Sequence, residues 1–218
     1  MDARILREVE LKQRERYSER LKKFGNDPRT LGWDSQESQR VRFARVLESV
    51  ALEGRSLLDI GCGLADLLGF IREQGAELSA YTGWDINPDL IQACQERFPE
   101  SAFEVRNLML DAEAASPFDV VTMFGVLNFR FREFENETFA RQMIGKAFAL
   151  CNEALVVDML SDLRDPSYPS EEFVYYYSPA AILEFAFSLT PHVTLRHDYA
   201  SIPQREFTLI LRKVPCGL

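Results

Sequence analysis

Apolar and polar positions divide the sequence into a charged helical N-terminal part and a longer part in which strands and helices alternate. Residues 2–24 are densely charged, and their apolar side chains recur at the three- and four-residue spacing of a helix. A second helix is expected from about Gln36 to Val50, with the hydroxyl of Ser35 as its N-cap. We therefore predict an N-terminal helical cover over residues 1–50.

Beyond this cover, short apolar segments alternate with amphipathic helices. Strands are expected at 56–60, 80–84, 103–107, 118–124, 154–159, 193–199 and 206–211. Helices are expected at 66–74, 87–98, 133–151 and 178–189. Strands that alternate with helices form right-handed crossovers and a parallel sheet that is covered on both faces. The last two strands are joined only by residues 200–205, which is too short for a helical crossover, so they should pair antiparallel.

The predicted fold class is therefore α/β. We expect a seven-stranded, mostly parallel sheet with one antiparallel strand and with helices on both faces. This Rossmann-like part should occupy residues 51–218 and form a single compact domain together with the N-terminal helical cover. A chain of 218 residues has the size of one large domain, which agrees with this expectation.

Charge and cysteine content narrow the function classes. The formal net charge is −9, so a nucleic-acid partner is not expected, because a phosphate backbone would be repelled. No apolar run approaches the roughly 20 residues that span a bilayer, so no membrane association is expected. The four cysteines are scattered, without a metal-binding or redox spacing, which predicts no metal site. Scattered thiols and the lack of an apolar leader at the start predict a cytoplasmic location.

A glycine-rich turn follows the first predicted strand, in the sequence LLDIGCGLAD over residues 57–66. Gly61 and Gly63 allow a tight turn and a close approach of a ligand to the backbone. A dinucleotide-binding fold would prefer a third glycine where Asp66 stands, and a carboxylate there disfavours a pyrophosphate. Asp59 also suits a cationic ligand better than a phosphate.

A second motif closes the next strand, in the sequence GWDINPDLI over residues 83–91. Asp85 lies 24 positions after Gly61, where a carboxylate can accept hydrogen bonds from both hydroxyls of a ribose. Ile86 can pack against the face of an adenine. The two motifs together predict a site for an adenosine-containing ligand.

These motifs resemble those of the class I S-adenosylmethionine-dependent methyltransferases, and the resemblance covers roughly residues 35–212. It implies a small, stand-alone, bacterial-type member of that Rossmann-like family, with S-adenosylmethionine as cofactor and S-adenosylhomocysteine as its product. Ala65 stands where the family commonly has a third glycine. The cofactor-binding positions that the resemblance implies are Asp59, Gly61, Cys62, Gly63, Asp85, Ile86, Asn107, Leu108, Phe124 and Gly125, with Trp33 and Gln39 from the N-terminal cover.

In this resemblance Asp59, Gly61 and Gly63 hold the methionine half, and Phe124 with Gly125 lies beneath the sulfonium. Two of these positions have simpler interpretations beside the functional ones. The indole of Trp33 equally fits a hydrophobic plug at a helix start, and the side chain of Asn107 a residue that closes a turn. Gly-x-Gly alone is common in turns, so the prediction depends on the two motifs occurring together and in order.

No motif of fixed spacing identifies a catalytic residue. Asn128, three positions after Gly125, is placed to orient a substrate. His197 beside Asp198 could act as an oriented general base, although a half-buried structural pair on an outer strand is the favoured interpretation. The aromatic, acidic segment 160–177 is predicted to be a long loop, of which some aromatic rings could wall a substrate pocket while others must simply pack under the loop.

The function implied by the resemblance is methyl transfer by in-line displacement, catalysed by a methyltransferase of the general class EC 2.1.1. The sequence FGVLNF at 124–129 lacks the motifs of enzymes that methylate nucleic-acid bases. Together with the negative charge, this favours a small-molecule acceptor. The alternatives are a protein or RNA methyltransferase, a nicotinamide-dependent oxidoreductase on a related fold, and a non-catalytic methyltransferase-like partner protein. A homodimer through the charged N-terminal helix is also possible on this sequence.

Overall fold

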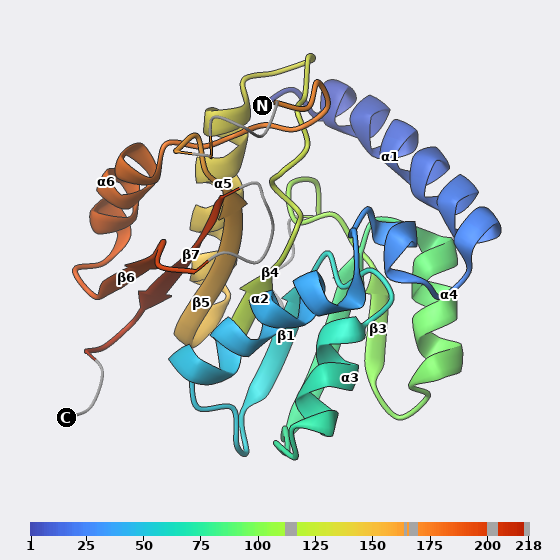
Figure 1. Cartoon of the computed structure of the whole chain (residues 1–218), viewed down its shortest axis with the longest axis horizontal. Coiled ribbons are helices and arrows are strands. Elements are labelled where there is room, and N and C mark those ends of the chain that lie inside the picture. Colours follow the sequence, from blue (N-terminus) through green and yellow to red (C-terminus); the bar gives the residue numbers. More distant parts are fainter. Residues whose placement is uncertain (112–116, 164, 166–169, 200–204, 216–218) are drawn as a thin grey trace. The chain divides into compact units, whose positions relative to one another are not determined.

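The computed structural model describes residues 1–111, 117–163, 165, 170–199 and 205–215 (Figure 1). The chain forms two compact units, Met1–Glu113 and Ala114–Leu218, which are described in turn. The connection 200–204 and the last cysteine, Cys216, lie outside the described residues.

The first unit begins with the two predicted helices, α1 (Ala3–Phe24) and α2 (Gln36–Ser49). The predicted cap of α2 is confirmed, since Ser35 Oγ accepts a hydrogen bond from the backbone N–H of Ser38 at 3.1 Å. Between the two helices, a short 3₁₀ helix η1 (Pro28–Leu31) occupies a segment that the sequence indicates only as a loop. The proline at its first position is preorganised for a helix start.

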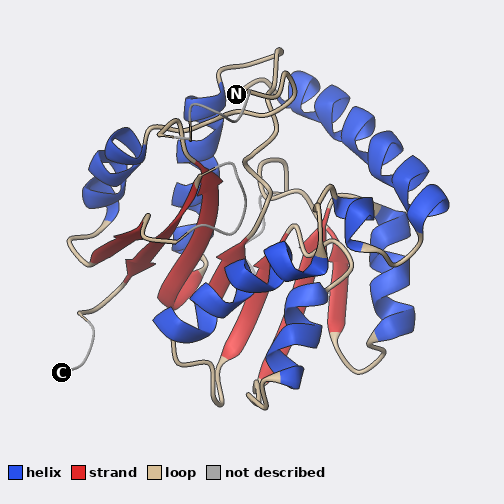
Figure 2. Cartoon of the chain, in the orientation of Figure 1, coloured by secondary structure: helices blue, strands red, loops and turns tan. Residues whose placement is uncertain are grey.

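Three parallel strands follow in this unit: β1 (Ser56–Ile60), β2 (Ala80–Asp85) and β3 (Ala102–Val105). The central strand β2 pairs with both of the others. Helices α3 (Asp66–Glu73) and α4 (Pro88–Arg97) connect the strands; α4 packs on β2, β3 and α1, and α3 packs on α2 (Figure 2). Because the strands are parallel, the loops after β1, β2 and β3 meet at one edge.

The second unit contains β4 (Phe118–Met123), α5 (Asn136–Ala149), β5 (Cys151–Leu160), α6 (Pro179–Leu189), β6 (Val193–Arg196) and β7 (Glu206–Arg212). Its strand order is β4-β5-β7-β6, whereas the first unit has the order β3-β2-β1. β4 and β5 are parallel, and β7 runs antiparallel to both β5 and β6. The core of this unit is a set of fully buried aliphatic and aromatic side chains, including those of Leu155, Phe207 and Leu209.

The predicted fold class is confirmed: the described residues form seven strands, mostly parallel, with β7 as the antiparallel one. Element ends differ by a few residues, as in β6, which ends at Arg196 rather than at residue 199. The helices predicted as a cover over residues 1–50 belong to the first unit together with β1 to β3. A boundary of that cover at residue 50 stays a prediction.

Candidate functional site

The glycine-rich turn after β1 is held against the end of β2. The backbone N–H groups of Gly61 and Cys62 both donate to the carbonyl oxygen of Trp84, at 2.7 and 3.0 Å. Gly61 has φ +71° and Gly63 has φ +57°, which is a backbone region that favours glycine. Ala65 adopts φ +56° at the start of α3, so the position where the related family commonly has glycine is also left-handed here.

Asp85, the last residue of β2, joins the two motifs. Its Oδ2 accepts a hydrogen bond from the backbone N–H of Gly63 at 3.1 Å, and its Oδ1 accepts one from Asn87 at 2.8 Å. Burial raises the pKa of Asp85 to about 6, while backbone hydrogen bonds and the charge of Arg14 act in the opposite direction. Each carboxylate oxygen can accept a further hydrogen bond, so Asp85 can hold hydroxyl donors of a ligand.

Asp59 lies deep in the same unit, with 3 % of its surface exposed. It accepts a hydrogen bond from the hydroxyl of Tyr81 at 2.8 Å. Burial, together with the charge of Asp59, holds the pKa of the Tyr81 hydroxyl well above its usual value. Tyr81 was not among the predicted site residues, because an aromatic residue in a buried strand is typical of a core position.

The remaining predicted positions of the first two motifs also lie at this edge. Cys62 is 5 % exposed, and its Sγ lies 2.8 Å from the point that a Cβ on Gly83 would occupy. Ile86 is half-buried directly after Asp85, and Leu108 is buried. The side chain of Cys62, which belongs to the glycine turn, therefore packs against β2.

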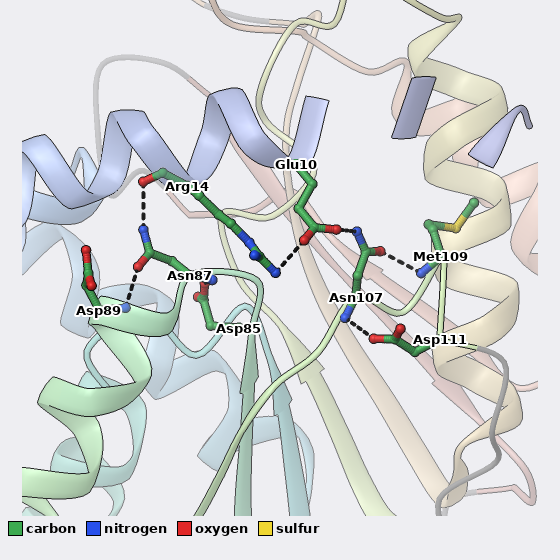
Figure 3. A network of polar contacts seen from close by, with 8 residues as sticks. All are labelled: Glu10, Arg14, Asp85, Asn87, Asp89, Asn107, Met109 and Asp111. Carbon is green, nitrogen blue, oxygen red and sulfur yellow. Dashed lines mark hydrogen bonds and ion pairs between the residues drawn. The ribbon is translucent and has the colours of Figure 1, made fainter. Parts of the chain in front are cut away.

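Asn107, predicted to lie beside an adenine, uses both ends of its amide. Its Nδ2 donates to Glu10 Oε2 of α1 at 2.7 Å, and its Oδ1 accepts from the backbone N–H of Met109 at 2.9 Å (Figure 3). Its own backbone N–H donates to Asp111 Oδ2 at 2.7 Å. The side chain does close a turn, as the simpler interpretation expected, and it also contacts α1.

A second contact fixes α1 near the end of β2. Asn87 is fully buried; its Oδ1 caps α4, and its Nδ2 donates to the carbonyl oxygen of Arg14 at 2.8 Å and to Ser18 Oγ at 3.1 Å. Arg14 forms an ion pair with Glu10 one turn earlier (Figure 3). The sequence pattern identified α1 as a helix but did not indicate that its polar side chains reach the site.

The two positions predicted from the N-terminal cover have partners within the unit. Gln39 is 2 % exposed and donates through Nε2 to Asp66 Oδ2 at 3.0 Å. The guanidinium of Arg42 lies over the ring of Trp33 at 4.3 Å, and Trp33 is half-buried. A contact of either residue with a cofactor stays a prediction.

Asp66 differs from its sequence-based interpretation. Its carboxylate pairs with Arg97 Nη1 at 2.6 Å in addition to the contact with Gln39. Asp66 therefore repels a pyrophosphate less strongly than the sequence suggests, because a guanidinium balances its charge. The buried Asp59 still disfavours a pyrophosphate at this turn.

The other predicted residues belong to the second unit and follow its strands. Phe124 is buried at the end of β4, and the backbone N–H of Gly125 donates to Asp158 Oδ1 at 2.6 Å. Asn128 Oδ1 accepts from the backbone N–H of Leu160 at 3.0 Å. The structure thus ties the segment after β4 to β5.

His197 is also in the second unit. Its Nε2 lies 2.9 Å from Ser161 Oγ, and Ser161 is fully buried at the end of β5. The carboxylate of Asp198 forms an ion pair with Arg196 at 3.2 Å. The observed hydrogen-bond partner of the imidazole is thus a serine hydroxyl.

In the aromatic segment at 160–177, some rings are buried and others are exposed to solvent. Tyr177 is fully buried, and its hydroxyl donates to the carbonyl oxygen of Leu127 at 2.8 Å. Phe173 is 58 % exposed. Residues 164 and 166–169 of the segment lie outside the described part.

Among the residues that the structure describes, no helix combines the length and the hydrophobicity that a bilayer crossing requires. No group of three His, Cys, Asp or Glu side chains among these residues is arranged to hold a metal ion.

Comparison with known proteins shows a similarity to methyltransferases. Residues 58–145 match the family described as a methyltransferase domain. Among curated protein sequences, no match to the chain was found. The solved structures that resemble it have low sequence identity and therefore show the fold.

The N-methyltransferase NodS from Bradyrhizobium japonicum WM9, in complex with S-adenosylhomocysteine, has 17 % identity and a TM-score of 0.63, covering 91 % of this chain and 97 % of its own. A TehB-like methyltransferase from Corynebacterium glutamicum has 19 % identity and a TM-score of 0.59. The match covers 92 % of this chain and 98 % of that methyltransferase. Magnesium protoporphyrin IX methyltransferase from Synechocystis, with bound S-adenosylhomocysteine, has 17 % identity and a TM-score of 0.61, covering 82 % and 83 %. Residues 58–145 of the chain therefore resemble a methyltransferase domain, and the chain has the fold of S-adenosylmethionine-dependent methyltransferases.

Proposed function

We propose that the chain transfers a methyl group from S-adenosylmethionine to a small-molecule acceptor by in-line displacement, with S-adenosylhomocysteine as the product. The observation that carries this proposal is the position of Asp85. Its carboxylate ends β2 and contacts the glycine turn through Gly63 at 3.1 Å, where it can accept the hydroxyls of a ribose. The related structures that hold S-adenosylhomocysteine support the choice of cofactor.

The residues present fit this cofactor. Gly61 and Gly63 bring no side chain of their own to the turn, where the side chain of Leu31 packs against Gly63, and Asp85 supplies acceptors for the ribose hydroxyls. The Nε of Arg14, whose charge acts on Asp85, is buried and has no hydrogen-bond partner among the described residues. A buried donor without a partner is costly, so an acceptor atom of a ligand would satisfy it.

We assign the chain's residues to binding and orientation. When bound, S-adenosylmethionine supplies a methyl group on a sulfonium centre that is reactive without further activation. Asp59, Gly61, Cys62 and Gly63 would hold the methionine half, while Ile86, Leu108 and Asn107 would contact the adenine. Alignment of donor and acceptor can then supply most of the acceleration, so a dedicated general base is not required.

Two residues of the second unit are candidates for contact with the acceptor. The Nδ2 of Asn128 makes no hydrogen bond to the part of the chain that is described, so it is available to orient a polar substrate. His197 is the other candidate, as a base that Ser161 orients. Phe124 and Gly125 are proposed to lie beneath the sulfonium, and Trp33 and Gln39 to contact the amino-acid end.

The net charge and the related enzymes favour a small-molecule acceptor. A net charge of −9 disfavours a nucleic-acid acceptor. Magnesium protoporphyrin IX methyltransferase and the amino pentose methyltransferase CalS10, both similar in fold, are named for small-molecule acceptors. A nicotinamide oxidoreductase remains disfavoured, because the buried Asp59 lies beside the turn that would hold a pyrophosphate. A cytoplasmic location and a homodimer through α1 are further parts of the proposal.

The acceptor class is tested by incubating the protein with S-adenosylmethionine and one of three fractions: a low-molecular-mass cell extract, dialysed protein, or purified RNA. We expect S-adenosylhomocysteine to accumulate above background only with the low-molecular-mass extract, because a small molecule is the proposed acceptor. The Asp85→Ala variant serves as the inactive control. Accumulation that depends on the RNA or on the dialysed protein would contradict the small-molecule proposal.

A further inference from the structure

We infer that Glu10, on α1, is a specificity-determining residue that positions Asn107 to recognise the 6-amino group of adenine. This inference rests on the proposed cofactor, and it adds a residue outside the methyltransferase motifs. Glu10 lies 97 positions before Asn107 in the sequence, and the two side chains meet at 2.7 Å (Figure 3).

The hydrogen bonds around Asn107 allow only one orientation of its amide. A carboxylate such as Glu10 only accepts, so it requires the Nδ2 side of the amide. The backbone N–H of Met109 only donates, so it requires the Oδ1 side. Met109 belongs to the same turn as Asn107, whereas Glu10 holds the amide from another element. Glu10 therefore restricts the rotation that the local turn alone would leave to a half-buried asparagine.

Glu10 is itself held in place. Its side chain is 12 % exposed, and its second carboxylate oxygen forms an ion pair with Arg14. The helix carrying both residues is anchored by Asn87, which donates to the carbonyl oxygen of Arg14 and to Ser18 Oγ. A partly buried carboxylate with two partners and a fixed helix has one preferred position, which it imposes on Asn107.

The fixed orientation of the Asn107 amide determines which group at position 6 of a purine it can bind. Asn107 Oδ1 uses one lone pair for Met109 and keeps a second one, so it can accept a hydrogen bond from the 6-amino group of adenine. A purine with an oxygen at position 6 presents an acceptor instead, and two acceptors repel each other. The Glu10–Asn107 pair should therefore select S-adenosylhomocysteine over its deaminated analogue, S-inosylhomocysteine.

The test is calorimetric titration of both ligands into the full chain. Wild-type protein is expected to bind S-adenosylhomocysteine at least about tenfold more tightly than the analogue. Glu10→Ala should weaken S-adenosylhomocysteine about five- to tenfold with little change for the analogue, so that most of the preference is lost. Glu10→Gln keeps an acceptor oxygen and should retain most of the preference. Glu8→Ala, at an exposed position of the same helix, is the matched control and should leave both affinities unchanged.

A double-mutant cycle shows whether Glu10 acts through Asn107. In an Asn107→Ala background, Glu10→Ala should have no further effect on either affinity. If the two effects add, or if Glu10→Ala weakens both ligands equally, Glu10 has only a structural role and the inference is wrong. Should Glu10→Ala fail to fold, Glu10→Asp replaces it, because that variant keeps the charge near Arg14 but shortens the reach to Asn107. A wild-type protein that binds neither ligand contradicts the proposed function itself, which distinguishes the two failures.

Discussion

Replacing Asp85 by alanine is expected to weaken the binding of S-adenosylhomocysteine at least about a hundredfold. In the proposed complex the carboxylate accepts both ribose hydroxyls, and a hydrogen bond to a charged group contributes about 1.5–3 kcal/mol. Losing two such bonds corresponds to at least two factors of ten in the dissociation constant. The measurement is calorimetric titration of wild type and variant at pH 7.5.

The fold should survive this substitution. Asp85→Ala leaves the N–H groups of Gly63 and Asn87 without their acceptor, but it also removes a buried charge. We expect the free energy of unfolding to change by less than about 2 kcal/mol, since the two effects oppose each other. Asp89→Ala, at an exposed carboxylate four positions later in α4, is the matched control and should change the affinity less than twofold. An Asp85→Ala protein with wild-type affinity would show that the ribose assignment is wrong.

The same carboxylate should make binding depend on pH. Burial raises the pKa of Asp85 to about 6, and only the ionised form accepts both hydroxyls. Affinity for S-adenosylhomocysteine should therefore fall about tenfold between pH 7.5 and pH 5, and the step should disappear in Asp85→Ala.

The stability of the ligand-free protein should change with pH in the opposite direction to the ligand affinity. The folded state binds this proton more tightly than the ordinary value of 3.8 implies, so the free energy of unfolding of the ligand-free protein should decrease from about pH 4 to about pH 6.

Gly83→Ala is expected to lower the free energy of unfolding by about 3 kcal/mol, which is a drop of roughly 6–12 °C in the thermal midpoint. A Cβ at this position of β2 would lie 2.7 Å from Cδ1 of Phe103 and 2.8 Å from Sγ of Cys62. Both neighbours are buried, so neither can move away freely. Because Cys62 lies between the two glycines of the turn, the substitution should also weaken S-adenosylhomocysteine binding. Thermal unfolding and ligand titration of the variant provide the two measurements.

Two further variants separate crowding from other effects of the added methyl group. Cys62→Ala removes the sulfur atom, so the double variant with Gly83→Ala should recover part of the lost stability, with a coupling of about 1 kcal/mol. Gly145→Ala, in the interior of α5 with no atom within 4 Å of the new Cβ, should instead stabilise the protein slightly. If the stability changes of Cys62→Ala and Gly83→Ala simply add in the double variant, the added methyl group does not clash with the sulfur atom.

Strands and helices whose ends are marked by turn or capping residues could be predicted from the sequence. β1 was predicted with its observed bounds, Ser56–Ile60, because an apolar run ends at a glycine turn. The helix expected at 87–98 begins with an asparagine followed by proline, and Asn87 Oδ1 accepts from the N–H groups of Asp89 and Leu90, as a helix cap does. The contact between the two motifs, Asp85 with Gly63, follows from two parallel strands that end at one edge.

What the sequence could not predict are contacts between distant polar side chains. Glu10 and Asn107 are 97 residues apart, and nothing in the charged pattern of α1 distinguishes Glu10 from its exposed neighbour Glu8. The hydrogen bond from Tyr81 to Asp59 was missed for a similar reason, because period-2 burial predicts the ring but not the direction of its hydroxyl. Pairings of this kind depend on tertiary geometry.

The central claim, that this chain is a methyltransferase that uses S-adenosylmethionine, is tested most directly by calorimetric titration of the wild-type protein at pH 7.5. S-adenosylhomocysteine, S-adenosylmethionine and NAD⁺ are titrated separately, and the protein is shown to be folded in the same buffer by thermal unfolding. We predict saturable binding of both sulfur ligands at one site per chain and no binding of NAD⁺. A folded protein that binds NAD⁺, or that binds neither S-adenosylhomocysteine nor S-adenosylmethionine, would contradict the claim.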